Sequence, residues 1–337
     1  MSRSASIDGI KAVASQLIVL HHLALYAPMS ATLGEAWPQV TAFVAEHGRL
    51  AVQPFLVLGG WHAALSLQRL GNASWSRLVL QRYLRLAPSL AVALVLVMAA
   101  TAAFHDVLHG QNWLSPLPGA GGFLAHVLLL QDLLGIPSIS AGAWYVAIDL
   151  QCFALLALLT CWQLRAGRSS ADAPAAALVA LATAASIVLF SRDAALDVWA
   201  IYFLSAYGLG VLAAWSLGNR AARWWMACTV LVLGLDLLLE PRPRPLLALG
   251  TALALLAISK PTRSCSSTGS KGFLGRISYG VFVGHFTVII VVSALWTMTE
   301  ASGVAMAFAF TLLAWAAAIA LGWAIQALVG RVGPGRA

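Results

Sequence analysis

The sequence has 337 residues, of which 61% are hydrophobic and 9% are charged, and its formal net charge is +8. A soluble domain carries about a quarter charged residues, so this composition excludes a soluble globular protein and predicts an integral membrane protein. The basic residues stand in short segments between apolar runs, which indicates membrane orientation rather than nucleic-acid binding. The four cysteines lack metal-ligand spacing, and no metal is expected.

About twenty apolar residues are needed to cross a membrane as a helix. This criterion predicts an all-α bundle of about ten transmembrane helices, at residues 10–28, 50–68, 84–104, 143–164, 174–191, 198–217, 223–239, 245–259, 277–297 and 302–329. The apolar segment 123–135 is too short to span, and we expect it to be re-entrant or interfacial within the loop 105–142. No polar segment could form a separate soluble domain, so 1–337 is predicted to be a single transmembrane domain.

The distribution of basic residues predicts the orientation, because cytoplasmic segments carry an excess of Lys and Arg. With a cytoplasmic N-terminus and ten spans, all but four of the 20 Lys and Arg residues are cytoplasmic, and the outer ones are Arg49, Arg192, Arg242 and Arg244. Counting 123–135 as a further span would destroy this bias. Both termini are therefore expected to be cytoplasmic.

The first span carries ionisable residues at helical spacing. Lys11 and His22 are eleven residues apart, which is almost three turns of α-helix, so they share one face. The residues on this face are Asp8, Lys11, Ser15 and His22, whereas His21 points about 100° away. An ionisable group inside a span is costly and usually has a function. A histidine that only packs against a neighbouring helix is the alternative interpretation.

Two arginines, Arg82 and Arg85, stand three residues apart in QRYLRLAPS at the cytoplasmic start of the third span. Residues at this spacing share a helix face, and guanidinium groups suit phosphate groups. The alternative is that these arginines only follow the positive-inside rule or contact anionic lipid head groups.

Asp149 lies about six residues into the fourth span from its outer end, at about the predicted depth of His22. A carboxylate beside an imidazole fixes the tautomer of the ring and raises its basicity, an arrangement used for general bases. We therefore expect His22 to act as a general base that Asp149 orients. A buried polar pair that only joins two helices is the alternative.

The segment GRISYGVFVGHF, residues 275–286, begins at the cytoplasmic edge of the ninth span with Arg276. His285 is predicted to lie about 12 Å further along the helix, which is nearer the inner half of the membrane and away from Asp149. His285 is therefore interpreted as a structural or substrate-positioning group rather than as the base.

Taken together, these segments resemble the membrane acyltransferase 3 family. The matching segments are IDGIKAV followed by His22, GRLAVQPFLVLGGW, RYLRLAP, WYVAIDLQCF and GRISYGVFVGH, in the family's order between residue 7 and about residue 289. Three positions depart from the family pattern. Lys11 replaces an arginine, Gly59 replaces a serine, and Asp149 with Leu150 replaces a pair of carboxylates.

The resemblance implies an O-acyltransferase that takes an acyl group, acetyl above all, from cytoplasmic acyl-CoA. The acceptor would be a hydroxyl of a carbohydrate or related glycan at the outer face of a bacterial cytoplasmic (inner) membrane, among membrane lipids and without nucleic acid. The expected catalytic residues are His22 and Asp149. Residues expected to bind acetyl-CoA are Lys11, Arg82, Arg85 and Arg276. Residues expected to bind substrate are Trp144, Gln151, Tyr279 and His285.

Other functions remain open at this point. A proton-coupled transporter of a sugar or small anion could use the same buried histidine and aspartate as a proton relay. Inverted repeats or broken helices would be expected of a transporter, and the sequence displays neither. A purely structural scaffold would leave the buried ionisable groups unexplained. For the enzyme, we expect the outer loops 29–49 and 105–142 to shape the acceptor site.

Overall fold

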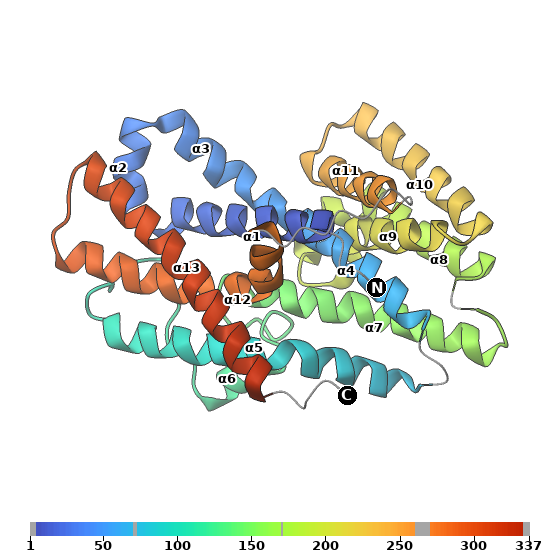
Figure 1. Cartoon of the computed structure of the whole chain (residues 1–337), viewed down its shortest axis with the longest axis horizontal. Coiled ribbons are helices and arrows are strands. Elements are labelled where there is room, and N and C mark those ends of the chain that lie inside the picture. The colour runs from blue at the N-terminus through green and yellow to red at the C-terminus, as the bar shows by residue number, and fades with distance from the viewer. Residues whose placement is uncertain (1–4, 70–72, 170, 260–269, 333–337) are drawn as a thin grey trace. The chain divides into compact units, whose positions relative to one another are not determined.

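The computed structural model describes residues 5–69, 73–169, 171–259 and 270–332, and within these ranges it contains helices and no β-strand (Figure 1). Of the predicted cytoplasmic basic residues, Arg3, Lys260, Arg263 and Arg336 lie outside the described residues, and so does Cys265. The three described cysteines, Cys152, Cys161 and Cys228, are free thiols.

Eight candidate membrane spans are found among the described residues: Ala5–Tyr26 (α1), Pro38–Leu67, Trp75–Phe104 (α5), Ala143–Arg165 (α7), Ala173–Arg192, Arg220–Leu239 (α10), Gly272–Met298 and Val304–Arg331. Two shorter apolar helices, α9 (Ala200–Ser216) and α11 (Pro243–Ile258), match the remaining predicted spans. The prediction of an all-α protein with about ten membrane-crossing helices is confirmed. Within 123–135 the only helical residues belong to the eight-residue α6 (Ala120–Val127), too short to cross.

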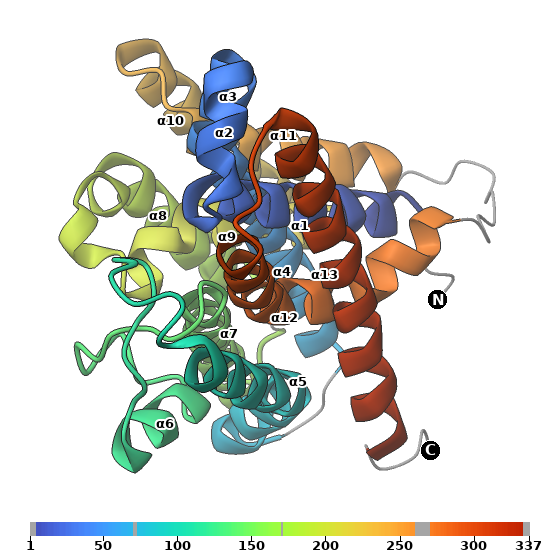
Figure 2. The same cartoon turned by 90° about the vertical axis from the view of Figure 1, so that its left-hand side faces the viewer.

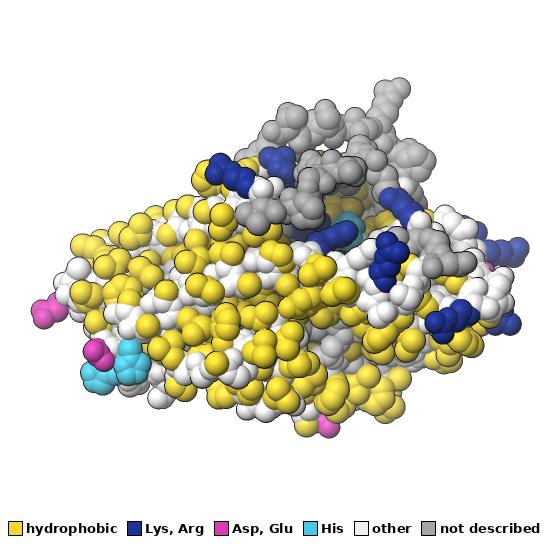
Figure 3. Space-filling view, turned by 90° about the horizontal axis from the view of Figure 1, so that it is seen from below, with side chains coloured by type: hydrophobic (Ala, Val, Ile, Leu, Met, Phe, Trp, Pro, Cys, Tyr) yellow, Lys and Arg dark blue, Asp and Glu magenta, His cyan; other side chains and the backbone are white. Residues whose placement is uncertain are grey.

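The outward side chains of these helices suit lipid. Leu238 on α10 is 82% exposed and Trp224 on the same helix is 67% exposed. Hydrophobic side chains cover most of the face shown in Figure 3. A large exposed apolar surface marks a membrane or protein contact, and here it coincides with helices of spanning length, so the chain is an integral membrane protein.

The helices pack into two compact units. Unit 1 contains Met1–Ala51, Leu86–Trp144 and Ser266–Ala337, and unit 2 contains Val52–Arg85 and Tyr145–Cys265. The single domain expected from the sequence stays a prediction.

In unit 1, α1 packs against α12 (Ser270–Met298) and the two helices run in the same direction. Gly275 lies against the backbone of Asp8 near the start of both helices, and His285 contacts His22 further along. A Cβ atom on Gly275 would lie 2.5 Å from the carbonyl oxygen of Asp8, so only glycine permits this approach. The parallel direction agrees with the predicted orientation of the first and ninth spans.

Small residues also join α12 to α13 (Val304–Val332), which lie side by side (Figure 2). A Cβ atom on Gly280 would lie 2.3 Å from the carbonyl oxygen of Gly322. Glycines at such a crossing let two helix backbones approach closely. In lipid the hydrophobic effect does not drive helices together, and close packing at small residues stabilises their association instead.

The predicted outer loop 29–49 is helical. It forms α2 (Met29–Ala36) and α3 (Pro38–His47), and α3 continues through the 3-10 turn η1 (Gly48–Ala51) into α4 (Val52–Leu67). The second span is thus a broken helix, a feature that the sequence did not reveal. A short 3-10 stretch inside a longer helix often marks a functional position, and here Gly48 packs directly on the side chain of His21.

In unit 2, α4 crosses α9 at glycines. A Cβ atom on Gly60 would lie 2.0 Å from the carbonyl oxygen of Tyr207, and one on Gly210 would lie 2.0 Å from that of Val57. Because backbone atoms cannot move aside cheaply, these glycines fix the crossing of the two helices. Unit 2 also contains α8 (Ala173–Val188) and the 3-10 turns η2 (Phe190–Arg192) and η3 (Ala194–Leu196).

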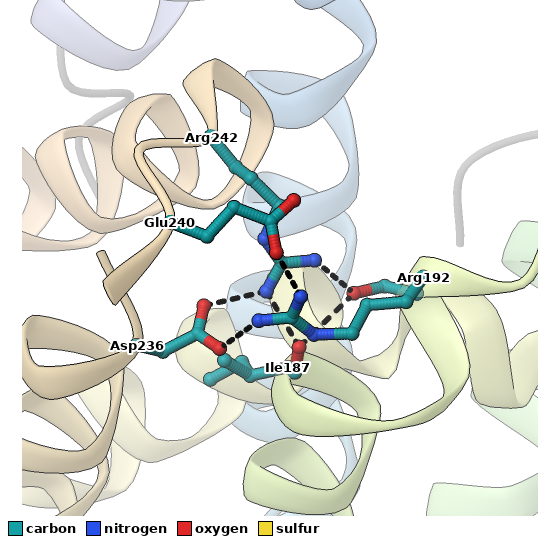
Figure 4. A network of polar contacts seen from close by, with 6 residues as sticks. Ile187, Arg192, Asp236, Glu240 and Arg242 are labelled. Carbon is teal, nitrogen blue, oxygen red and sulfur yellow. Dashed lines mark hydrogen bonds and ion pairs between the residues drawn. The ribbon is translucent and has the colours of Figure 1, made fainter. Parts of the chain in front are cut away.

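A polar network joins η2 to the last turn of α10 and to the segment between α10 and α11 (Figure 4). Asp236 accepts hydrogen bonds from Arg192 at 2.6 Å and from Arg242 at 2.5 Å, and Arg192 also pairs with Glu240. Arg242 donates to the carbonyl oxygen of Ile187 at the end of α8. Arg192 and Arg242, two of the four basic residues predicted outside, therefore have their charges neutralised locally by carboxylates.

We predict that Asp236→Asn lowers the thermal unfolding temperature in detergent by several degrees. The change removes the buried carboxylate that neutralises both Arg192 and Arg242, and a neutral amide takes its place. Glu240→Gln is the matched control, since Glu240 is 55% exposed and its ion pair contributes at most about 1 kcal/mol. Equal effects of the two changes would contradict the central role of Asp236.

Candidate active site

The two histidines of the α1–α12 contact form a hydrogen-bonded pair in unit 1. His22 Nδ1 lies 2.7 Å from His285 Nε2. The ring planes differ by 5° and the ring centroids are 4.9 Å apart, so the two imidazoles meet edge to edge in nearly one plane. Both side chains are buried, His285 completely.

The hydrogen bonds of His285 determine which nitrogen carries each proton. His285 Nδ1 lies 2.7 Å from the carbonyl oxygen of Phe282, and a carbonyl can only accept, so Nδ1 is the donor. In a neutral imidazole the other nitrogen, Nε2, is then an acceptor. His22 Nδ1 must donate to it. His22 Nε2 is left with a lone pair, which is the form that a general base requires.

The position of His285 corrects the sequence-based depth. It was expected in the inner half of the membrane, yet it lies near the middle of α12, directly against His22. The predicted depth of His22 was counted from the end of its helix, which was taken to lie at the outer surface. In the structure α1 ends at Tyr26, four residues after His22, whereas α12 continues for thirteen residues after His285, to Met298. The histidine pair therefore lies at the mid-length of a candidate span.

Aromatic rings surround the pair. The ring of Tyr26 is stacked on that of His22, with centroids 5.5 Å apart and planes at 19°. Trp113, from the segment between α5 and α6, and Phe286, on α12, both contact Tyr26. Trp113 could not be predicted from the sequence, because a lone tryptophan in a loop belongs to no recognisable pattern.

Asp149 has a different partner from the one expected. In unit 2, Arg82 Nε and Nη2 donate to both carboxylate oxygens of Asp149, at 2.7 to 3.1 Å. The guanidinium group also lies over the ring of Phe153, 5.3 Å from its centroid. The side chain of Asp149 is 5% exposed, so this is a buried, bidentate ion pair between α5 and α7. That Asp149 orients His22 stays a prediction, and His285 is the group that contacts His22.

The departure at Gly59 has a structural reason. A Cβ atom on Gly59 would lie 2.8 Å from Asp149 Oδ1 and 3.2 Å from the ring of Tyr207. The carboxylate cannot move away without breaking its bonds to Arg82. The absence of a side chain at Gly59 therefore leaves the space that the Asp149 carboxylate occupies in the ion pair.

The residues expected to bind the donor differ in availability. Arg85 and Arg276 are exposed, and neither makes a hydrogen bond or ion pair with another described residue. Arg82 uses Nε and Nη2 for Asp149, while its Nη1 makes no hydrogen bond within the described residues. Lys11 is half-buried on α1.

The residues expected to bind substrate make mainly structural contacts. The amide of Gln151 bonds to the carbonyl oxygen of Val198 and to the N–H of Ala200, and so anchors the start of α9. Tyr279 donates its hydroxyl proton to the carbonyl oxygen of Leu86 at 3.0 Å. Trp144 is half-buried at the start of α7. Their roles toward a substrate stay predictions.

Unit 2 also contains a cavity of about 320 Å³ between α7, α8 and α9. Its lining is almost entirely aliphatic, with Cys152, Thr183 and Tyr207 as the exceptions among residues such as Leu156. Such a lining suits a hydrocarbon chain and not the phosphates of a nucleotide.

Comparison with known families gives one match. A family model described as an acyltransferase domain matches residues 4–327, which is nearly the whole chain. No curated protein and no solved structure matches the chain.

We predict that Gly59→Ala destabilises the protein by about 1–3 kcal/mol, because the new methyl group pushes against a carboxylate that Arg82 holds in place. Gly234→Ala on α10 is the control, since nothing lies within 4 Å of its Cβ position and alanine favours a helix. Thermal unfolding in detergent compares the two. A Gly59→Ala protein as stable as Gly234→Ala would show that the ion pair tolerates the methyl group.

Proposed function

The chain belongs to the membrane acyltransferase 3 family, and on this premise we propose a specific reaction. The protein transfers an acyl group, acetyl above all, from acetyl-CoA on the cytoplasmic side to a hydroxyl of a carbohydrate or related glycan on the outer side. The membrane is a bacterial cytoplasmic (inner) membrane. The observation that carries the proposal is the hydrogen bond between His22 Nδ1 and His285 Nε2, from which we infer that His22 Nε2 holds a lone pair.

In the proposed reaction, His22 Nε2 removes the proton from the acceptor hydroxyl as its oxygen attacks the thioester carbonyl. The carbon–sulfur bond then breaks, and the proton passes from His22 to the leaving thiolate. His285 keeps His22 Nδ1 protonated and the ring oriented throughout. Direct attack of His22 Nε2 on the thioester, giving an acyl-histidine that the acceptor then cleaves, uses the same tautomer.

The donor is proposed to bind through guanidinium groups at the cytoplasmic edge. Arg85 and Arg276 are exposed, have no ion-pair partner among the described residues, and suit the phosphates of coenzyme A. Arg82 contributes through Nη1 while Asp149 holds the rest of its guanidinium in place, and Lys11 adds charge. Because the histidine pair lies midway along α12, the acyl-bearing arm of the donor need reach only half-way through the protein.

The 3-10 turn η1, which interrupts the α-helical geometry between α3 and α4, is a feature that favours the transporter alternative. A transporter would carry the acceptor across the membrane unmodified, whereas the proposed enzyme modifies it on the outer face. The two functions therefore differ in what happens to the acceptor and not only in rate.

We predict that His22→Ala lowers transfer by at least about 10²-fold, because the base is lost, while His21→Ala has a much smaller effect. The measurement uses sealed, oriented vesicles with acetyl-CoA on the cytoplasmic side and follows acetylation of an outer glycan by mass spectrometry. Size-exclusion chromatography checks that both variants are folded. Full activity of His22→Ala would exclude the base, and accumulation of unmodified glycan inside the vesicles would favour the transporter.

A second prediction concerns His285. His285→Ala removes the acceptor for His22 Nδ1–H and should lower kcat by roughly 10–100-fold, with the KM for acetyl-CoA unchanged. His285→Gln places an amide oxygen near the former Nε2 and should restore part of kcat. If the His285→Gln and His285→Ala proteins have the same kcat and unfold at the same temperature, His285 does not act through this hydrogen bond.

A further inference from the structure

Three aromatic rings gather beside His22 from segments far apart in the sequence. Tyr26 ends α1, Trp113 lies between α5 and α6, and Phe286 follows His285 on α12. Their centroids are 5.7 to 6.0 Å apart in all three pairs. All three belong to unit 1. We name Tyr26, Trp113 and Phe286 the aromatic cluster.

The aromatic cluster is not an ordinary part of the core. Phe286 is buried, but Tyr26 and Trp113 are only half-buried. The hydroxyl of Tyr26 makes no hydrogen bond within the described part of the chain. The indole N–H of Trp113 bonds to the exposed Gln111 at 3.1 Å. Two of the three rings thus keep accessible surface, and polar groups stand at their edges.

The chemistry of these rings favours one class of ligand. A pyranose presents a face of C–H groups and a rim of hydroxyls. The C–H groups are attracted to the electron-rich face of an aromatic ring, and the rim can bond to groups such as the Tyr26 hydroxyl. A purely aliphatic ligand would offer no hydrogen-bond partner to the Tyr26 hydroxyl.

We propose that the aromatic cluster is the acceptor subsite, on which the pyranose ring bearing the reacting hydroxyl lies against Trp113 and Tyr26. Since Tyr26 is stacked on His22, a sugar held there has a hydroxyl within reach of the base. The cluster selects the acceptor as a carbohydrate and plays no part in binding the donor. This inference rests on the proposed acyltransferase function.

The test measures acceptor kinetics with purified protein, acetyl-CoA, and methyl hexopyranosides as acceptors. Trp113→Ala should raise the KM for the pyranoside by about tenfold or more and leave the KM for acetyl-CoA unchanged. Trp113→Phe, which keeps a ring, should lie between wild type and Trp113→Ala. Trp323→Ala is the matched control, because Trp323 is also a tryptophan of unit 1 but lies on α13, 54% exposed and outside both predicted outer loops.

The outcomes separate the subsite from the proposed function. If wild type acetylates pyranosides and the Trp113 variants have the same acceptor KM, the subsite is wrong and the function stands. If Trp113→Phe raises both KM values together, the cluster only supports the fold, and the inference fails. If wild type acetylates no pyranoside but does acetylate n-octanol, the carbohydrate acceptor and the subsite fail together.

Discussion

The candidate active site depends on one buried hydrogen bond, between His22 and His285. It exists because α1 and α12 run parallel and approach closely at Gly275, which brings two imidazoles to the same depth in one plane. The carbonyl oxygen of Phe282 then fixes the proton on His285 and, through it, the proton on His22. A backbone group thus decides the chemistry of a side chain on another helix.

The sequence predicted the elements of this protein better than the pairings between them. Apolar length alone located the eight candidate spans and the two shorter apolar helices of the described residues, because lipid demands about twenty apolar residues per spanning helix. Span length could not predict that His285 lies at the level of His22. Depths were counted from the helix ends, and α12 extends further past His285 than α1 does past His22. The pairing of His22 with Asp149, inferred from matching depths, stays a prediction, and the partner that the structure shows for Asp149 is Arg82. Trp113 had no periodicity that could reveal it.

The ion pair between Arg82 and Asp149 shows how departures from a family pattern can be related. A serine in place of Gly59 would put its Cβ against a carboxylate that is already held by Arg82. The glycine at position 59 therefore leaves space for the carboxylate of Asp149 that Arg82 holds. The buried pair joins α5 to α7 through Nε and Nη2 of Arg82.

The parallel contact between the first helix and the penultimate one also affects how the protein matures. His22 and His285 are separated by 263 positions in the chain, and a ribosome needs roughly 15 to 50 s to add that many residues. During this time α1 waits in the membrane without its partner, and His22 has no neighbour that sets its tautomer. The hydrogen bond between His22 and His285 therefore forms only after α12 has been synthesised, so a chain that has not yet reached α12 lacks the histidine pair.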